Sequence, residues 1–133
     1  MKRIVVDLDG TLTIDTPNTP YAEKEPNLVL IERLREYKAE GFDIVIATAR
    51  NMRTYGGSIG HINANTLPVI IDWLRKHSVP YDEIHVGKAW CGEDGFYIDD
   101  KAIRPSEFLS KSYEELRALL SAECVNAEHA GSP

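Results

Sequence analysis

Short apolar runs, each followed at once by polar residues, recur along the chain. They occupy residues 4–6, 42–47, 83–86 and 95–98. The first run is uninterrupted, which is typical of a strand inside a parallel sheet, where both faces of a strand are covered. We therefore predict four parallel strands, the first of them buried on both faces.

Between these runs, apolar residues recur at helical spacing. One such segment extends from Leu28 to Glu40 and is followed by Gly41, a common helix stop. A second begins at Thr66 and Pro68, and a third begins at Ser112, whose partner Glu115 completes a capping-box pattern. The expected buried positions are Leu30, Ile31, Leu34 and Tyr37 in the first helix, Ile70, Ile71 and Leu74 in the second, and Leu116, Leu119 and Leu120 in the third. Strands that alternate with helices predict an α/β fold built from βαβ units.

The length of 133 residues, with 43% hydrophobic and 27% charged residues, is that of one globular domain. We place this domain at residues 1–121. Residues 122–133 are small and polar, and we expect a disordered C-terminal tail there.

Composition also indicates where the protein is located and which classes of partner it binds. No apolar run approaches the length of a membrane span, and Lys2 and Arg3 precede too few apolar residues to form a signal-peptide core. We therefore expect a cytoplasmic protein with no membrane partner. Two cysteines make no disulfide framework, and a net charge of −6 disfavours nucleic acid as a partner.

The polar residues that end the strands carry the candidate chemistry. In open α/β sheets, ligands bind outside the carboxyl ends of the strands. If the four strands are parallel neighbours, one edge of the sheet collects Asp7, Asp9, Thr48, Lys88, Asp99 and Asp100. Four carboxylates share a small site only when cations offset their repulsion or when some are protonated. Lys88 supplies one positive charge, and hard carboxylate and carbonyl oxygens favour Mg²⁺ for the rest.

The motifs DLDGTLT, ATAR, GK and YIDD, in this order, resemble the four signature motifs of haloacid dehalogenase-like phosphatases. The resemblance spans roughly residues 1 to 110. It implies a three-layer Rossmann-like fold with a mainly parallel central sheet and a minimal cap or none. It also implies hydrolysis of a phosphate monoester with Mg²⁺ as cofactor.

The resemblance assigns roles to particular residues. Asp7 would be the nucleophile that forms an aspartyl-phosphate, and Asp9 would be the general acid and base. Thr48, the amide of Ala49 and Lys88 would hold the phosphoryl oxygens. The implied metal ligands are the Asp7 carboxylate, the Asp9 carbonyl, Asp99 and, directly or through water, Asp100.

The substrate side of the site is open to several interpretations. Residues 14–27 are too short for a cap domain and allow only a flap, whereas 51–65 form a long glycine-rich loop. Arg50 and Arg53, with the neighbouring Asn51, are candidates for binding a second anionic group of the substrate. An equally good interpretation pairs Arg50 with a structural carboxylate. A site without a cap accepts bulky substrates or uses a neighbouring subunit of a homo-oligomer as its lid, and the sequence does not choose between the two.

The wider string from TARNMRTYGG to VGKAWCGEDGFYIDDKAIRPSEF resembles bacterial capsule or polysaccharide biosynthesis phosphatases. That resemblance implies a small phosphorylated substrate, a sugar or polyol phosphate. Two alternatives remain: a phosphotransferase or phosphomutase of the same family, and a non-catalytic regulatory domain similar to a phospho-receiver. The order of the motifs disfavours a receiver, because its acid pair follows the first strand, whereas Asp99 and Asp100 follow the last.

Overall fold

The structure is a computed structural model that describes residues 1–124. The chain forms two compact units, the first from Met1 to Trp90 and the second beginning at Cys91. The single domain expected over residues 1–121 thus contains two units.

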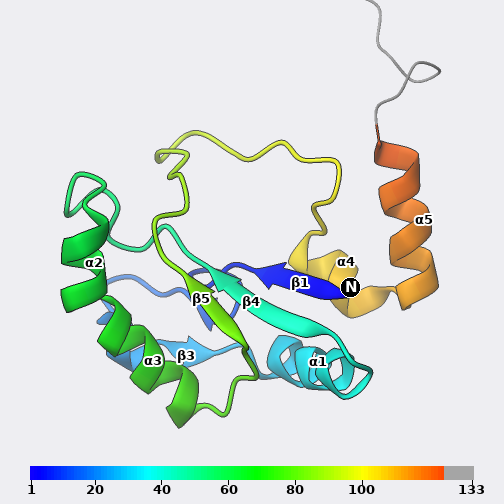
Figure 1. Cartoon of the computed structure of the whole chain (residues 1–133), viewed down its shortest axis with the longest axis horizontal. Coiled ribbons are helices and arrows are strands. Elements are labelled where there is room, and N and C mark those ends of the chain that lie inside the picture. The colour runs from blue at the N-terminus through cyan, green and yellow to red at the C-terminus, as the bar shows by residue number, and fades with distance from the viewer. Residues whose placement is uncertain (125–133) are drawn as a thin grey trace, which may run out of the picture. The chain divides into compact units, whose positions relative to one another are not determined.

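A parallel sheet forms the centre of the first unit (Figure 1). Its strands are β1 (Arg3–Val6), β4 (Asp43–Ala47) and β5 (Glu83–His85), in the order β1-β4-β5. Val6 lies opposite Ile46, and Ile46 lies opposite Ile84. All three strands point the same way, so their carboxyl ends meet at one edge of the sheet. Three of the predicted strands, their parallel direction and the α/β class are confirmed, and the arrangement is a small Rossmann-like fold.

The central strand β4 is buried on both faces, and the edge strand β1 is not. Ile44, Val45 and Ile46 are at most 2% exposed. In β1, Val6 is buried, but Val5 is 64% exposed. Successive side chains of a strand point to opposite faces. The prediction that the first strand is buried on both faces is therefore wrong, because β1 covers its Val6 face and leaves its Val5 face open.

Helix α1 (Leu28–Ala39) forms where the helical spacing predicts it. The side chain of Asn27 caps its first turn by accepting a hydrogen bond from the amide of Leu30. The four predicted positions are buried in the core: Leu30, Ile31, Leu34 and Tyr37. Gly41 follows the helix with a φ of +97°, a conformation that favours glycine.

The region between β4 and β5 contains more helix than the sequence predicted. Helix α2 (Ile59–Asn65) occupies the second half of the segment expected to be a loop, and α3 (Leu67–Lys76) follows it. The hydroxyl of Ser58 accepts a hydrogen bond from the amide of His61 and so caps α2, a local signal that outweighs the glycine in the helix. In α3, Trp73 takes the third buried position beside Ile70 and Leu74, whereas Ile71, expected there, is half-buried.

The segment expected to be a flap is a small hairpin. Strands β2 (Thr13–Ile14) and β3 (Glu25–Pro26) pair antiparallel, and the 3-10 turn η1 (Tyr21–Glu23) lies between them in the chain. We call residues 14–27 the flap. It connects the loop after β1 to α1.

The second unit contains the helices α4 (Pro105–Ser110) and α5 (Tyr113–Glu123). The expected capping box of Ser112 and Glu115 is present at the start of α5. Residues 95–98 do not form the fourth predicted strand, and Phe96 and Ile98 are 77% and 91% exposed. A strand needs a neighbour for its backbone hydrogen bonds, and the described part of this unit contains helices and irregular segments alone.

The disordered tail was expected to begin at residue 122. That start is wrong, because α5 extends through Glu123. Residues 125–133 of that tail lie outside the described residues.

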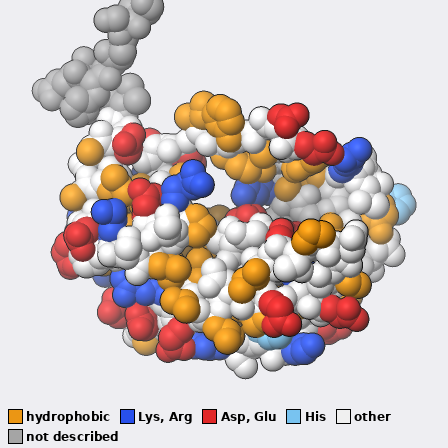
Figure 2. All heavy atoms as spheres, turned by 180° about the vertical axis from the view of Figure 1, so that it is seen from behind, with side chains coloured by type: hydrophobic (Ala, Val, Ile, Leu, Met, Phe, Trp, Pro, Cys, Tyr) orange, Lys and Arg blue, Asp and Glu red, His pale blue; other side chains and the backbone are white. Residues whose placement is uncertain are grey.

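Charged side chains of both signs are mixed on the surface shown in Figure 2. Apolar side chains lie among them singly or in small groups. The mixing brings opposite charges near one another and so reduces the self-repulsion that the net charge creates. Among the described helices, none has the length and apolar character that crossing a membrane requires.

Candidate active site

The loop after β1 carries Asp7 and Asp9 around a tight turn. The buried carbonyl of Leu8 accepts hydrogen bonds from the amides of Thr11, Leu12 and Thr13. Gly10 has a φ of +78°, and its amide donates to the hydroxyl of Thr13 at 3.1 Å. A side chain at Gly10 would be strained in this conformation, so glycine allows the chain to turn between the two acids and the flap.

The carboxylate of Asp7 lies at the carboxyl edge of the sheet and is half-exposed. The hydroxyl of Thr11 donates to its Oδ2 at 3.2 Å, and Nζ of Lys88 lies 3.6 Å from its Oδ1. The side chains of Asp7 and Lys88 are 37% and 30% exposed. An accessible carboxylate and a cation therefore face each other where a phosphoryl group could approach both.

The ends of β4 and β5 are joined by backbone hydrogen bonds that place Thr48 and Lys88. The amide of Thr48 donates to the carbonyl of His85 at 2.9 Å, and the amide of Lys88 donates to the carbonyl of Thr48 at 3.1 Å. Gly87 turns the chain with a φ of +81°. The first unit thus brings together three of the predicted site residues: Asp7, Thr48 and Lys88.

Thr48 is 1% exposed, and its hydroxyl accepts a hydrogen bond from the amide of Arg50 at 3.1 Å. This bond holds the turn after β4 and fixes the direction of the hydroxyl's lone pairs. The hydroxyl proton is not used in that bond. Thr48 therefore retains a donor for an oxygen-rich ligand.

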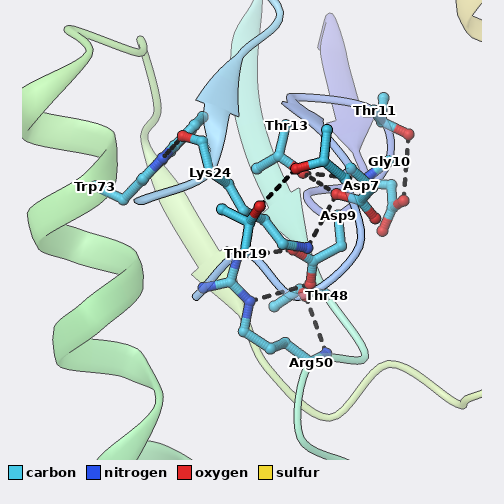
Figure 3. Close-up of polar contacts among 12 residues, drawn as sticks. Asp7, Asp9, Gly10, Thr11, Thr13, Thr19, Lys24, Thr48, Arg50 and Trp73 are labelled. Atoms are coloured by element: carbon cyan, nitrogen blue, oxygen red, sulfur yellow. Dashed lines mark hydrogen bonds and ion pairs between the residues drawn. The ribbon is translucent and has the colours of Figure 1, made fainter. Parts of the chain in front are cut away.

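Asp9 is paired with two cations. Arg50 donates to it twice, from Nη2 to Oδ1 at 2.8 Å and from Nε to Oδ2 at 3.0 Å. Lys24 donates from Nζ to Oδ1 at 3.0 Å. Figure 3 shows the Asp9 side chain directed toward Arg50 and Lys24, whereas the Asp7 side chain is directed toward Thr11. Of the two interpretations of Arg50, the structure shows the pairing with a carboxylate, and that carboxylate is Asp9.

These contacts hold Asp9 in its ionised form. Burial raises the pKa of the Asp9 carboxyl, but the hydrogen bonds and charges of Arg50 and Lys24 outweigh it and bring the pKa below its ordinary value of 3.8. At neutral pH Asp9 is therefore a carboxylate, the form that accepts a proton.

Lys24 is the main residue of the site that the sequence did not indicate. Its Nζ also donates to Asp15 at 2.9 Å, and its carbonyl accepts from the indole of Trp73 at 2.8 Å. The Lys24 side chain is 9% exposed. A lone lysine in a proline-containing segment carries no motif, and its contact with Asp9 depends on how the flap folds back over the loop after β1.

The other residues of the ATAR segment have separate environments. The Asn51 amide oxygen accepts from the hydroxyl of Thr66 at 2.7 Å, and its amide nitrogen donates to Thr54 at 3.1 Å. Asn51 thus ties the turn after β4 to the start of α3. Arg53 is exposed and lies 5.9 Å from the ring centre of Trp90. Of the three substrate-binding candidates, Arg53 is the one whose side chain is exposed to solvent.

The last two candidates, Asp99 and Asp100, belong to the second unit and are exposed. Oδ1 of Asp99 accepts from the amide of Lys101 at 2.8 Å, which closes a local turn. Their use as metal ligands remains a prediction.

A magnesium ion fits the donors of the first unit in chemical type. The Asp7 carboxylate is accessible, and the loop after β1 also offers backbone carbonyls, both of which are hard oxygen ligands. No group of three or more His, Cys, Asp or Glu side chains placed to hold a metal occurs among residues 1–124. The Asp9 carboxylate is already neutralised by Arg50 and Lys24, so of the two acids in the loop after β1, Asp7 is the one whose carboxylate is available to a cation.

Acids and cations gathered at the carboxyl edge of a parallel α/β sheet form the kind of site at which α/β enzymes bind anionic substrates. The family model of haloacid dehalogenase-like hydrolases matches residues 4–71, which all lie in the first unit. This match covers just over half of the chain, and the chain belongs to the haloacid dehalogenase-like hydrolase family.

A solved structure is also similar to this chain. It is the crystal structure of an MCSG target from Vibrio cholerae, which is 60% identical, with a TM-score of 0.88 over 93% of this chain and 100% of that one. Among curated proteins, none matches this chain.

Proposed function

We propose that this hydrolase is a Mg²⁺-dependent phosphatase that cleaves a phosphate monoester through an aspartyl-phosphate on Asp7. The observation that carries the proposal is the approach of Lys88 to Asp7, 3.6 Å from Nζ to Oδ1, beside Thr48 at the carboxyl edge of the sheet. A nucleophilic carboxylate, a cation for the phosphoryl oxygens and a hydroxyl donor are what phosphoryl transfer to a side chain requires.

In the first step a carboxylate oxygen of Asp7 bonds to phosphorus, and the bond from phosphorus to the ester oxygen breaks. Lys88, Thr48 and the amide of Ala49 bind the equatorial oxygens, where negative charge is spread in the transition state. The leaving oxygen takes a proton through Asp9. Asp9 is ionised at neutral pH, so this proton comes either from a monoanionic ester, or from solvent once the added negative charge of the substrate raises the proton affinity of Asp9.

In the second step water attacks the phosphorus of the aspartyl-phosphate and releases phosphate. Asp9 takes a proton from that water, for which its ionised form is suited. The Asp7 carboxylate is then free for another turnover.

The residues that would hold Mg²⁺ are Asp7 through its carboxylate, Asp9 through its carbonyl, Asp99 and Asp100. When bound, the ion would offset the carboxylate charge and polarise the phosphoryl oxygens. Asp99 and Asp100 enter this set through the YIDD motif of the family resemblance.

For the substrate we propose a sugar or polyol phosphate used in the synthesis of polysaccharide precursors. The similarity of the ATAR-to-YIDD region to capsule biosynthesis phosphatases supports this class. Arg53 and Trp90, exposed beside each other after β4 and β5, supply a cation and an apolar ring for the part of the substrate beyond the phosphate.

The test is release of inorganic phosphate from a panel of sugar phosphates, polyol phosphates, nucleotides and 3′-phosphorylated oligonucleotides, with Mg²⁺ and with EDTA. We expect Mg²⁺-dependent turnover that is highest for a sugar or polyol phosphate and absent in Asp7→Asn. No phosphate release from any ester, or undiminished release by Asp7→Asn, would refute the proposal.

A further inference from the structure

The Asp9 carboxylate is held by three donors from two segments that are distant in the sequence. Nε and Nη2 of Arg50 come from the turn after β4, and Nζ of Lys24 comes from the flap (Figure 3). The two Arg50 bonds form a fork on both carboxylate oxygens, which defines the plane as well as the position of the carboxylate.

The pairing is buried, unlike a surface ion pair. The side chains of Arg50 and Lys24 are 1% and 9% exposed, and that of Asp9 is 25% exposed. The remaining nitrogen of Arg50, Nη1, is buried without a hydrogen-bond partner. A buried charged cluster with an unsatisfied donor contributes little to the stability of the fold, because apolar side chains in the same positions often stabilise it as well or better.

The surroundings restrict the two cations further. The guanidinium carbon of Arg50 lies 4.2 Å from the ring centre of Tyr21, and Nζ of Lys24 lies 4.9 Å from the same ring. Asp15 accepts from Lys24 and from the hydroxyl of Thr13. The flap contains all three of these partners: Asp15, Tyr21 and Lys24. The orientation of Asp9 and the position of the flap therefore depend on the same contacts.

We infer that Arg50 and Lys24 are positioning residues that hold the Asp9 carboxylate in one orientation and tie it to the flap. The two hydrogen bonds from Arg50 orient the carboxylate. The hydrogen bond from Lys24 makes that orientation depend on the position of the flap. The inference rests on the proposed function, in which Asp9 transfers the proton of the leaving group. Neither Arg50 nor Lys24 needs to touch the substrate for this role.

The experiment compares two kinds of ester in the full chain with Mg²⁺. p-Nitrophenyl phosphate has a leaving group that departs without a proton, whereas the best alkyl phosphate of the substrate panel needs one. In Lys24→Met and Arg50→Lys we expect the loss of kcat for the alkyl phosphate to exceed the loss for p-nitrophenyl phosphate by about tenfold or more. The reason is that a misplaced Asp9 slows only the departure of a leaving group that needs a proton. We expect KM for both esters to change less than about threefold.

Two further variants distinguish the loss of Asp9 orientation from a general disturbance of the structure. Lys24→Arg keeps a donor at this position and should recover most of the lost alkyl phosphatase activity. Lys38→Met removes a lysine of the same unit that bonds to Asp82 at 2.8 Å instead of Asp9, and it should leave the ratio of the two kcat values unchanged. Equal losses for both esters in Lys24→Met and Arg50→Lys, or no loss in either, would overturn the inference.

Crystal structures of the metal-free wild type, Lys24→Met and Arg50→Lys supply a measurement that does not depend on turnover. We expect one Asp9 conformation in the wild type and a second or weakly defined one in at least one variant. An unchanged Asp9 in both variants would overturn the inference. If the wild type cleaves no ester, the proposed function fails, and these structures alone decide whether Arg50 and Lys24 position Asp9.

Discussion

Lys88 places its ammonium nitrogen 3.6 Å from Oδ1 of Asp7, although the two residues follow different strands of the sheet. Asp7 comes directly after β1, and Lys88 comes three residues after the end of β5. The central strand β4 separates these strands in the sheet order, so the contact spans the carboxyl edge of β4. This contact defines the candidate phosphoryl site more closely than any other in the first unit.

Replacing Lys88 by methionine tests this contact. Lys88→Met keeps most of the side-chain length but removes the cation, so we expect kcat/KM for the best ester to fall about 100-fold or more, because developing charge loses its electrostatic partner. Steady-state kinetics checks it. Lys88→Arg, which restores a cation, should recover part of the loss, and activity equal to wild type in Lys88→Met would contradict the assignment.

Asp7→Asn should remove the nucleophile without disturbing the fold. Asparagine matches aspartate in size, and Asp7 is half-exposed, so we expect a Tm near that of the wild type and a loss of kcat of about 1,000-fold or more. Phosphate release and a thermal melt measure the two effects. A Thr11→Val variant, which removes the hydroxyl that bonds to Asp7 at 3.2 Å, should lose much less activity than Asp7→Asn.

The two acids of the second unit give separate predictions for the metal. If Asp99 contacts Mg²⁺ directly and Asp100 acts through water, Asp99→Asn should raise the Mg²⁺ concentration for half-maximal activity far more than Asp100→Asn does. Mg²⁺ titration of phosphate release measures this. The same half-maximal concentration in the wild type and both variants would exclude both residues as ligands.

Asp82 provides a prediction about stability and pH away from the site. Its carboxylate accepts from Lys38 and from the amide of Ile44, each at 2.8 Å, and these contacts lower its pKa, the Lys38 hydrogen bond most. A carboxyl whose pKa is lower in the folded state stabilises the fold above its ordinary pKa of 3.8 and loses that effect as the pH falls through the folded value.

We therefore expect Asp82→Asn to have a lower free energy of unfolding than the wild type at pH 7, and the difference to shrink below about pH 4. Urea denaturation at several pH values measures it. Asp43→Asn is the matched control, because Asp43 meets the same lysine at the longer distance of 3.7 Å. A difference that grows toward low pH would show that the sign is wrong.

Two glycines of the same region should respond in opposite ways to alanine. Gly87 has a φ of +81°, and a Cβ there would collide with the end of the Ile59 side chain, so Gly87→Ala should lower the free energy of unfolding by about 1 kcal/mol or more. It should also lower activity, because Gly87 sets the turn before Lys88.

Gly60 lies in α2, and a Cβ added there would meet nothing within 4 Å. Gly60→Ala should therefore stabilise the fold by about 0.5–1 kcal/mol, since alanine has the higher helix propensity. Chemical denaturation of both variants tests the pair, and a stabilised Gly87→Ala would contradict the strain that we assign to this turn.

Much of the fold follows from patterns within a few residues of each other. The apolar runs that became β1, β4 and β5 and the helical spacing of α1 predict these elements, because local backbone preference and burial agree there. The sequence did not predict α2 because its signal is the single cap at Ser58. Residues 95–98 have the composition of a strand, but composition cannot supply the neighbouring strand that the backbone needs.

The sequence by itself determined which residues end the strands. The parallel pairing of β1, β4 and β5 then brings Asp7, Thr48 and Lys88 to one edge of the sheet. Tertiary structure alone decided which cations hold Asp9, because Arg50 and Lys24 reach it from the turn after β4 and from the flap. The point where a strand ends is a local property of the chain. An ion pair between distant segments depends on how those segments pack, and no motif of a few residues encodes that.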